Sequence, residues 1–137
     1  VFPIPVEITY GLERLEMFIE GREDMYDLQW SDDVTYRDLR LAEERQFSEF
    51  NFRQATVKSL RDQFALAEAE ARQLADKGLV LPAYDMCLKS SHLFNLLDAR
   101  GAISVTERVK MIAQVRALVI QVARKYAGAA AAEEGDS

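Results

Sequence analysis

The pattern of apolar and polar positions predicts a mainly helical chain. The clearest helix begins near residue 57 and ends at Gly78, because its apolar residues recur at alternating spacings of three and four and so fall on one stripe. That stripe consists of Val57, Leu60, Phe64, Ala67, Ala71 and Leu74. A further helix is predicted from Pro82, a residue that suits a first helical turn, to about Ala99.

The last predicted helix begins at Ser104-Val105-Thr106-Glu107. In this spacing the serine and glutamate side chains satisfy each other's backbone amides, which marks a helix start. The helix is expected to reach about residue 126 and to bury a stripe made of Val105, Ile112, Val115, Val119, Val122 and Tyr126.

The first third of the chain is less regular. Alternation of apolar and polar residues over 6–10 predicts a short strand, and Gly11 is followed by a predicted helix of two to three turns that ends at Gly21. Residues 22–35 are predicted as an ordered loop and 36–54 as a second helix with an irregular phase. A strand needs a partner and no second strand is convincing, so its partners are expected outside these 137 residues.

These elements predict a mainly α fold, a bundle of about five helices preceded by a short strand and helix. The expected organisation is a strand–helix element over 1–21, the loop over 22–35, a helical domain over 36–127 and a flexible tail or linker over 128–137. The tail is rich in alanine and then acidic, a composition typical of frayed or disordered ends.

The composition argues against several classes of protein. Hydrophobic residues make up 49% and charged residues 29%, as in ordinary globular proteins. One cysteine excludes an internal disulfide framework and a cysteine-rich zinc site, and we predict no metal site within the chain. The net charge of −6 argues against a surface that binds nucleic acid broadly. A local excess of bases in 108–125 is interpreted as a solvated helix face.

The strongest candidate for chemistry is Glu13-Arg14, two and three residues after Gly11. Glycine leaves space where a ligand could lie against the backbone, and arginine can stack on a base or bind phosphate oxygens with two donors. Taken alone, this pair is better explained as a structural salt bridge at a helix start.

Other polar and aromatic residues are interpreted structurally. The single histidine, His92, is predicted to lie in the core, and Asp98-Ala99-Arg100 is predicted to be a capping and ion-pair cluster. Phe47, Phe50 and Phe52 are predicted to pack, with base stacking left open. Trp30 could be a pocket wall or a docking anchor.

Two segments carry a resemblance to a known family. Glu7-Ile8-Thr9-Tyr10-Gly11-Leu12-Glu13-Arg14 resembles motif 3 of class II aminoacyl-tRNA synthetases, and specifically that of the α subunit of the bacterial-type heterotetrameric glycyl-tRNA synthetase. Leu81-Pro82-Ala83-Tyr84, Leu88-Lys89, His92 and the run from Phe94 to Arg108 resemble the same family. The resemblance covers about residues 1–126 and implies a C-terminal portion that begins just before motif 3.

The resemblance implies roles for five residues. Arg14 looks like the arginine that clamps ATP, Glu13 like its partner, and Gly11 like the residue that gives the nucleotide room. Glu7 and Thr9 look like residues that face the glycine pocket. The implied reaction joins glycine and ATP into glycyl-adenylate, with Mg²⁺ on the phosphates, and then charges tRNA(Gly).

The resemblance also implies partners and a location. The implied partners are a second α subunit and a β subunit or fused β region that carries most tRNA contacts. The implied location is the bacterial cytoplasm, or alternatively a plastid or the mitochondrial matrix. Motifs 1 and 2 are expected upstream, so these residues alone are expected to be inactive. The alternative is a synthetase-derived, non-catalytic helical subunit of a larger assembly, which the absent motifs favour and the intact Glu13-Arg14 pair opposes.

Overall fold

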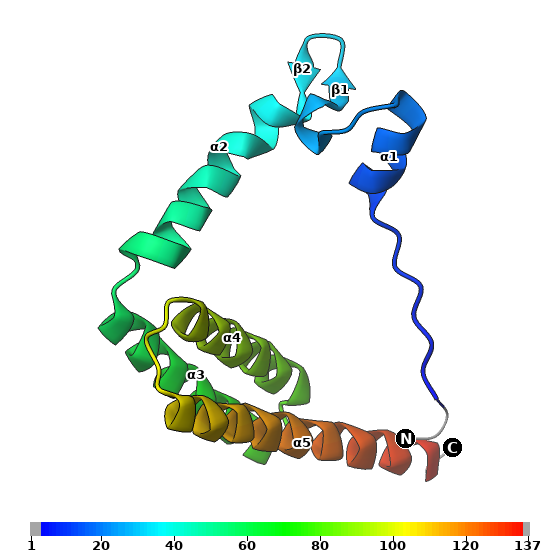
Figure 1. The fold of residues 1–137 in the computed structure, drawn as a ribbon. Coiled ribbons are helices and arrows are strands. Elements are labelled where there is room, and N and C mark those ends of the chain that lie inside the picture. Colours follow the sequence, from blue (N-terminus) through cyan, green and yellow to red (C-terminus); the bar gives the residue numbers. More distant parts are fainter. Residues whose placement is uncertain (1–3, 136–137) are drawn as a thin grey trace. The chain divides into compact units, whose positions relative to one another are not determined.

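The computed structural model describes residues 4–135 and divides into two compact units between Glu49 and Phe50 (Figure 1). We call them the N-terminal unit, which runs to Glu49, and the helical unit, which begins at Phe50. The described residues contain five α-helices and one short two-stranded sheet, which confirms the predicted mainly helical fold. No helix in this part of the chain is both long and apolar enough to cross a membrane.

The N-terminal unit is built from short elements. In chain order they are α1 (Leu12–Glu20), the 3₁₀ turn η1 (Met25–Asp27), β1 (Gln29–Ser31), β2 (Val34–Thr35) and α2 (Tyr36–Glu49). The two strands form an antiparallel hairpin in which Gln29 pairs with Thr35 and Ser31 with Val34. Gly21 ends α1 in the left-handed conformation, at φ 64°, that glycine adopts without strain.

Two predictions for this unit have different outcomes. Residues 6–10 are extended and pair with no backbone within residues 4–135, as expected if the partners of the strand lie outside the chain, so the strand itself stays a prediction. The segment 22–35 is not only a loop, since it contains η1 and the hairpin. The strands of the hairpin have three and two residues, too few for an alternating pattern to be recognised in the sequence.

The helical unit begins with a short π-helix, η2 (Phe50–Gln54), and continues with α3 (Val57–Asp76), α4 (Val80–Ala99) and α5 (Val105–Gly135). The three long helices pack against one another (Figure 1). The predicted second helix therefore changes at Glu49 from α to π geometry. The tail predicted from residue 128 is helical through Gly135, and residues 136–137 lie outside the described part.

The core of the helical unit consists of two clusters of buried side chains. One is centred on Leu97 and includes Leu60, Phe64, Leu93 and Met111. The other contains small residues of α3 and α4 against α5, namely Ala71, Ala75, Ala83, Cys87, Leu118 and Val122. Burial raises the pKa of the Cys87 thiol, which therefore stays protonated at neutral pH.

The predicted stripe of α3 is confirmed at its four central positions, which are all buried (Leu60, Phe64, Ala67 and Ala71). The stripe predicted for α5 is partly wrong: Val105, Val119 and Tyr126 are exposed, and Met111 and Leu118 are buried instead. Apolar residues occur on almost every face of α5, so periodicity alone did not show which face is buried.

His92 is exposed rather than in the core, and Phe47, Phe50 and Phe52 are exposed rather than packed.

The end of the helical unit where α4 turns into α5 is held by polar contacts. The predicted pair at the start of α5 is confirmed: Ser104 N donates to Glu107 Oε2 at 2.9 Å, and Glu107 N donates to Ser104 Oγ at 3.2 Å. Arg61 of α3 donates to Glu107 Oε1 at 2.9 Å and to the carbonyl of Ala102 at 2.7 Å. The predicted ion pair of Asp98 is with Arg108, whose Nε lies 2.7 Å from Asp98 Oδ1. We call this group the α4–α5 corner.

The corner predicts an acid-dependent loss of stability. The Ser104 amide, and then the Arg61 side chain, lower the pKa of Glu107 from 4.5 to about 2. Because the folded pKa is below the unfolded one, the stabilising contribution is complete above about pH 4.5 and is lost as the pH falls toward 2. Urea unfolding between pH 6 and pH 2.5 should therefore show a smaller decrease in the free energy of unfolding for Glu107→Gln than for the parent. Equal decreases would contradict this assignment.

Candidate functional site

The segment from Glu7 to Arg14 consists of an extended, exposed stretch followed by the first turn of α1. Thr9 Oγ1 donates to Glu7 Oε1 at 2.5 Å, so the two side chains lie on the same side of the extended backbone. This agrees with the shared face predicted from their spacing. Both side chains are accessible to a ligand.

Gly11 is the N-cap of α1, and its carbonyl accepts from Leu15 N at 3.1 Å. Its backbone angles, φ −84° and ψ 109°, are open to any residue. A Cβ atom at this position would meet only Arg14 Cβ, at the ordinary contact distance of 3.8 Å. Nothing in the described chain therefore requires glycine here, and a requirement would have to come from a bound molecule.

α1 presents two different faces. One face lines a groove of about 640 Å³ within the N-terminal unit, to which it contributes Leu12, Glu13, Leu15, Glu16 and Ile19. Leu28, Gln29, Trp30, Tyr36 and Arg40 line the rest of this groove. Arg14 lies about half a helical turn away, on the face opposite the groove.

The side chain of Arg14 is exposed and makes no hydrogen bond or ion pair with any other residue in the described range 4–135. Its position on the open face of α1 leaves the guanidinium accessible to a planar or anionic ligand. The predicted pairing with Glu13 is absent. Residues adjacent in sequence point about 100° apart on a helix, so their side chains do not face each other.

Glu13 is hydrogen-bonded to Tyr36 instead, with 3.0 Å between the Tyr36 hydroxyl and Glu13 Oε1. The amide of Glu13 itself, followed by this hydroxyl, lowers the pKa of Glu13 below its usual range. The same hydrogen bond to a carboxylate raises the pKa of Tyr36. Glu13 is thus held ionised and links α1 to the start of α2.

Tyr36 also belongs to an aromatic cluster that organises the N-terminal unit. Its ring centroid lies 6.4 Å from that of Tyr26 and 6.5 Å from that of Trp30. The Arg37 guanidinium lies 5.7 Å from the centre of the Tyr26 ring and forms ion pairs with Asp24 and Asp27. The cluster fixes the hairpin and η1 around the start of α2.

The contact of Tyr36 with Glu13 was missed by the sequence analysis. One signal was present: Thr35 and Asp38 have the spacing of a helix start, and Asp38 Oδ2 accepts from Thr35 N at 2.8 Å and from Thr35 Oγ1 at 2.6 Å. That signal places Tyr36 in the first turn of α2. It does not show which residue the hydroxyl reaches, since Glu13 lies 23 positions earlier.

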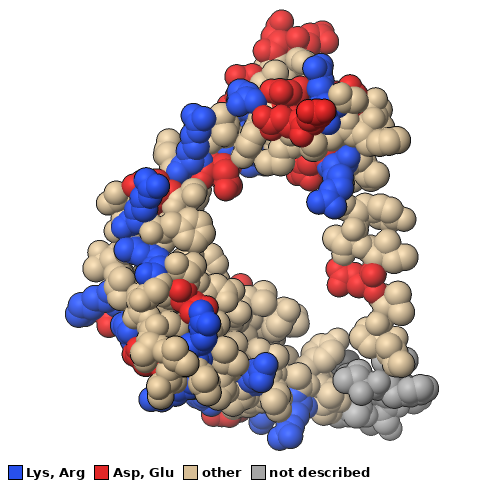
Figure 2. All heavy atoms as spheres, in the orientation of Figure 1, with Lys and Arg blue, Asp and Glu red and all other residues tan. Residues whose placement is uncertain are grey.

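Charged side chains are dispersed over both units. Figure 2 shows Lys and Arg side chains separated by acidic and uncharged ones on the face in view, rather than one continuous basic patch. Within residues 4–135, no group of three or more His, Cys, Asp or Glu side chains is arranged to hold a metal ion. Arg14 is one of the exposed cations in residues 4–135 that an organic or phosphate ligand could reach.

Comparison with known protein families identifies one match. A family model described as the glycyl-tRNA synthetase alpha subunit matches residues 1–131, nearly the whole chain. The chain belongs to the glycyl-tRNA synthetase alpha subunit family. It is accordingly part of a glycine–tRNA ligase, a class II aminoacyl-tRNA synthetase, and the resemblance found in the sequence is confirmed at the level of the family.

The link between Glu13 and Tyr36 predicts a specific titration result. Tyr36→Phe should raise the pKa of the Glu13 carboxyl, because one of the two donors that stabilise the carboxylate is lost. The pKa should stay below 4.5, since the helix amide, which has the larger effect, remains. Carboxyl ¹³C chemical shifts measured against pH would report both values. Tyr26→Phe is the matched control, and an unchanged Glu13 pKa in Tyr36→Phe would contradict the assignment.

Proposed function

We propose that residues 7–14 are the motif 3 part of the ligase active site, with Arg14 binding ATP. The observation that carries the proposal is the state of Arg14: exposed, without a side-chain partner in the described range, and on the face of α1 opposite the groove. A structural salt bridge would have used this guanidinium. Its planar group suits both stacking on adenine and two parallel hydrogen bonds to phosphate oxygens.

In this proposal the other residues of the segment bind or position the substrates and form no covalent bond with them. Gly11 lets the nucleotide approach the backbone, in keeping with the open space around it. Glu13 positions α1 through Tyr36 and leaves Arg14 free. Glu7 accepts a hydrogen bond from the ammonium group of glycine, and Thr9 orients the Glu7 carboxylate.

The reaction requires positioning and charge neutralisation more than a protein nucleophile. The glycine carboxylate attacks the α-phosphorus of ATP, the bond to the β-phosphate oxygen breaks, and pyrophosphate leaves. The tRNA 3′-terminal hydroxyl then displaces AMP from glycyl-adenylate. Arg14 stabilises the negative charge on the phosphates in the first step. Synthetases generally use ATP with Mg²⁺, which neutralises part of the phosphate charge.

The proposal predicts the effect of changing Arg14 in the complete ligase. Arg14→Ala should lower glycine-dependent ATP–pyrophosphate exchange at least about 100-fold, the loss typical of removing one transition-state donor. Arg14→Lys should recover only part of the rate, because lysine keeps the charge and loses the planar pair of donors.

Arg45→Ala is the matched control, since Arg45 on α2 is also exposed and without a side-chain partner in the described range. Circular dichroism should be the same for all three variants. Exchange at the parental rate in Arg14→Ala would exclude the ATP-clamp role and would favour the non-catalytic alternative for this segment.

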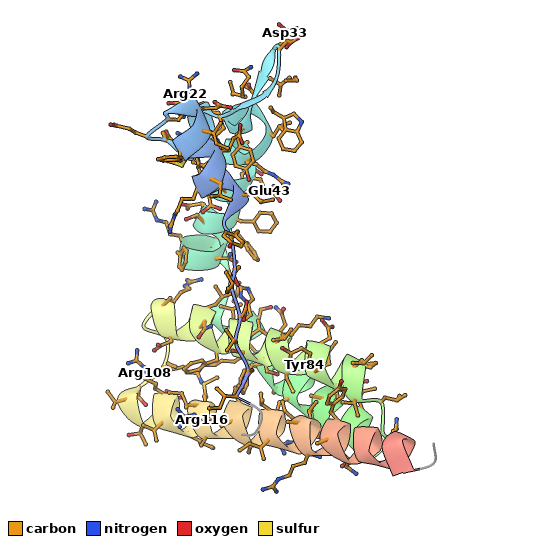
Figure 3. The ribbon with its side chains drawn as sticks, turned by 90° about the vertical axis from the view of Figure 1, so that its right-hand side faces the viewer. Arg22, Asp33, Glu43, Tyr84, Arg108 and Arg116 are labelled. Carbon is orange, nitrogen blue, oxygen red and sulfur yellow. The ribbon has the colours of Figure 1, made fainter. Side chains whose placement is uncertain are left out.

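We further propose that the helical unit docks onto the β part of the synthetase. An apolar groove of about 350 Å³ runs between the start of α4 and α5, lined by Val80, Leu81, Tyr84, Val119, Val122, Ala123 and Tyr126. Tyr84, labelled in Figure 3, contributes its ring from α4. Membership of an alpha subunit family supports a β subunit as the occupant of this exposed apolar surface.

This proposal predicts an assembly defect. Leu81→Glu should weaken co-purification of the α and β parts at least about tenfold, because a charge would be buried in an apolar contact. The fold should be unaffected, since Leu81 is 73% exposed and lies in the first turn of α4, where an acid is favourable. Leu66→Glu on α3, at a residue 71% exposed, is the control. Equal assembly of both variants would exclude this groove.

A further inference from the structure

The charged residues of α5 are of one sign over most of the helix. From residue 108 to residue 132 the sequence contains no acid, and its five bases are Arg108, Lys110, Arg116, Arg124 and Lys125. The other two long helices carry both signs, with Lys58 paired to Asp62 on α3 and Lys89 paired to Asp85 on α4. Positive charge in the helical unit is therefore concentrated on α5.

Most of these bases are not used within the protein. Arg108 is paired with Asp98 in the α4–α5 corner. The other four are Lys110, Arg116, Arg124 and Lys125. All four are exposed and form no hydrogen bond or ion pair with any residue in the range 4–135. Their charge does not stabilise the helical unit through any such contact, and it is accessible to a partner.

Three of these bases form a stripe along α5. At about 3.6 residues per turn, Lys110, Arg116 and Arg124 fall within about one third of the helix circumference, on the side away from the buried residues of α5. With a rise of about 1.5 Å per residue they extend over about 21 Å, a length over which a nucleic-acid duplex presents several phosphates. Figure 3 labels Arg116 near the middle of this stretch. We call these three residues the basic stripe.

The surface between the three bases is uncharged. Ala113 and Ala117 are exposed, and Ile120 is half exposed. Long cationic side chains thus extend from a helix surface of shorter apolar ones, which leaves room for a bulky anion to approach along the helix. Exposure to water alone does not explain the stripe, because solvated surfaces normally intersperse both signs of charge, as α3 and α4 do.

We propose that the basic stripe binds the phosphate backbone of the tRNA that the ligase charges. Because the chain is part of a glycine–tRNA ligase, its substrate is a polyanion. Lys and Arg side chains supply affinity for phosphates that does not depend on base sequence, and arginine can donate two parallel hydrogen bonds to one phosphate. Three contacts account for only part of the affinity for a tRNA, in keeping with the net charge of −6 for the whole chain. None of the three bases lines the apolar groove proposed for the β part, and the inference does not depend on the role proposed for Arg14.

Equilibrium binding of tRNA(Gly) to the complete ligase, measured against salt concentration, tests the stripe. Lys110→Gln, Arg116→Gln and Arg124→Gln together should raise the Kd at about 0.1 M salt at least about tenfold. The slope of the logarithm of the binding constant against the logarithm of salt concentration should become shallower by about 2 to 3, close to one for each lost phosphate contact. A noncognate tRNA should lose affinity by a similar factor, since phosphates carry no base sequence. Glycine-dependent ATP–pyrophosphate exchange, which needs no tRNA, should be unchanged.

Lys58→Gln, Lys77→Gln and Lys89→Gln together are the matched control, because they remove the same charge from exposed positions outside α5. Arg116→Lys with Arg124→Lys keeps the charge and should retain most of the affinity, since lysine also binds phosphate. If circular dichroism shows that the triple variant of the stripe loses helix, Arg124→Gln alone replaces it, with a decrease of about one in the slope. An unchanged Kd and slope in the folded variant, or equal losses in the control, would overturn the proposal. Weaker co-purification of the β part at unchanged tRNA affinity would also overturn it and would indicate an acidic protein partner instead.

Discussion

Close approach of three helices is the constraint on which the rest of the helical unit depends. Ala71 and Ala75 on α3 and Ala83 on α4 are completely buried, and their small side chains let α5 bring Leu118 into the same layer. Protein interiors are densely packed, so this layer fixes the helices relative to one another. The α4–α5 corner can hold arginines in defined positions only because the helices beneath it are fixed in this way.

The N-terminal unit is stabilised by a different balance of interactions. Leu28 is its only buried residue in the range 4–49, so apolar burial contributes little. Hydrogen bonds, ion pairs and ring contacts converge instead on Tyr36 and Arg37. Exposed pairs of this kind are individually weak, and the order of the unit comes from their mutual support. The face of α1 that carries Arg14 takes no part in these contacts.

Local signals predicted the helices well and the contacts between them poorly. The stripe of α3 and the Ser104–Glu107 pair depend on residues a few positions apart, and both were found from spacing. Other features depend on which surfaces meet in space, and no local sequence pattern predicts them. They are the phase of α5, the exposure of His92 and the hydrogen bond between Glu13 and Tyr36. The strand predicted over 6–10 stays a prediction for a related reason, since strand formation requires a neighbouring backbone and its partners are expected outside the chain. For the candidate site, the family was found and the role of residues 7–14 stays a prediction, whereas the contact of Glu13 with Tyr36 was missed.

The open surroundings of Gly11 have a consequence for genetics. Its backbone angles and neighbours tolerate a larger side chain, and serine is at least as favourable as glycine at an N-cap, so folding does not require glycine here. In the proposed role of Gly11, a serine substitution would therefore behave as a separation-of-function allele, which leaves protein abundance normal and alters ligand binding. Most positions in a small domain cannot be used in this way, because a change in side chain perturbs stability and activity together.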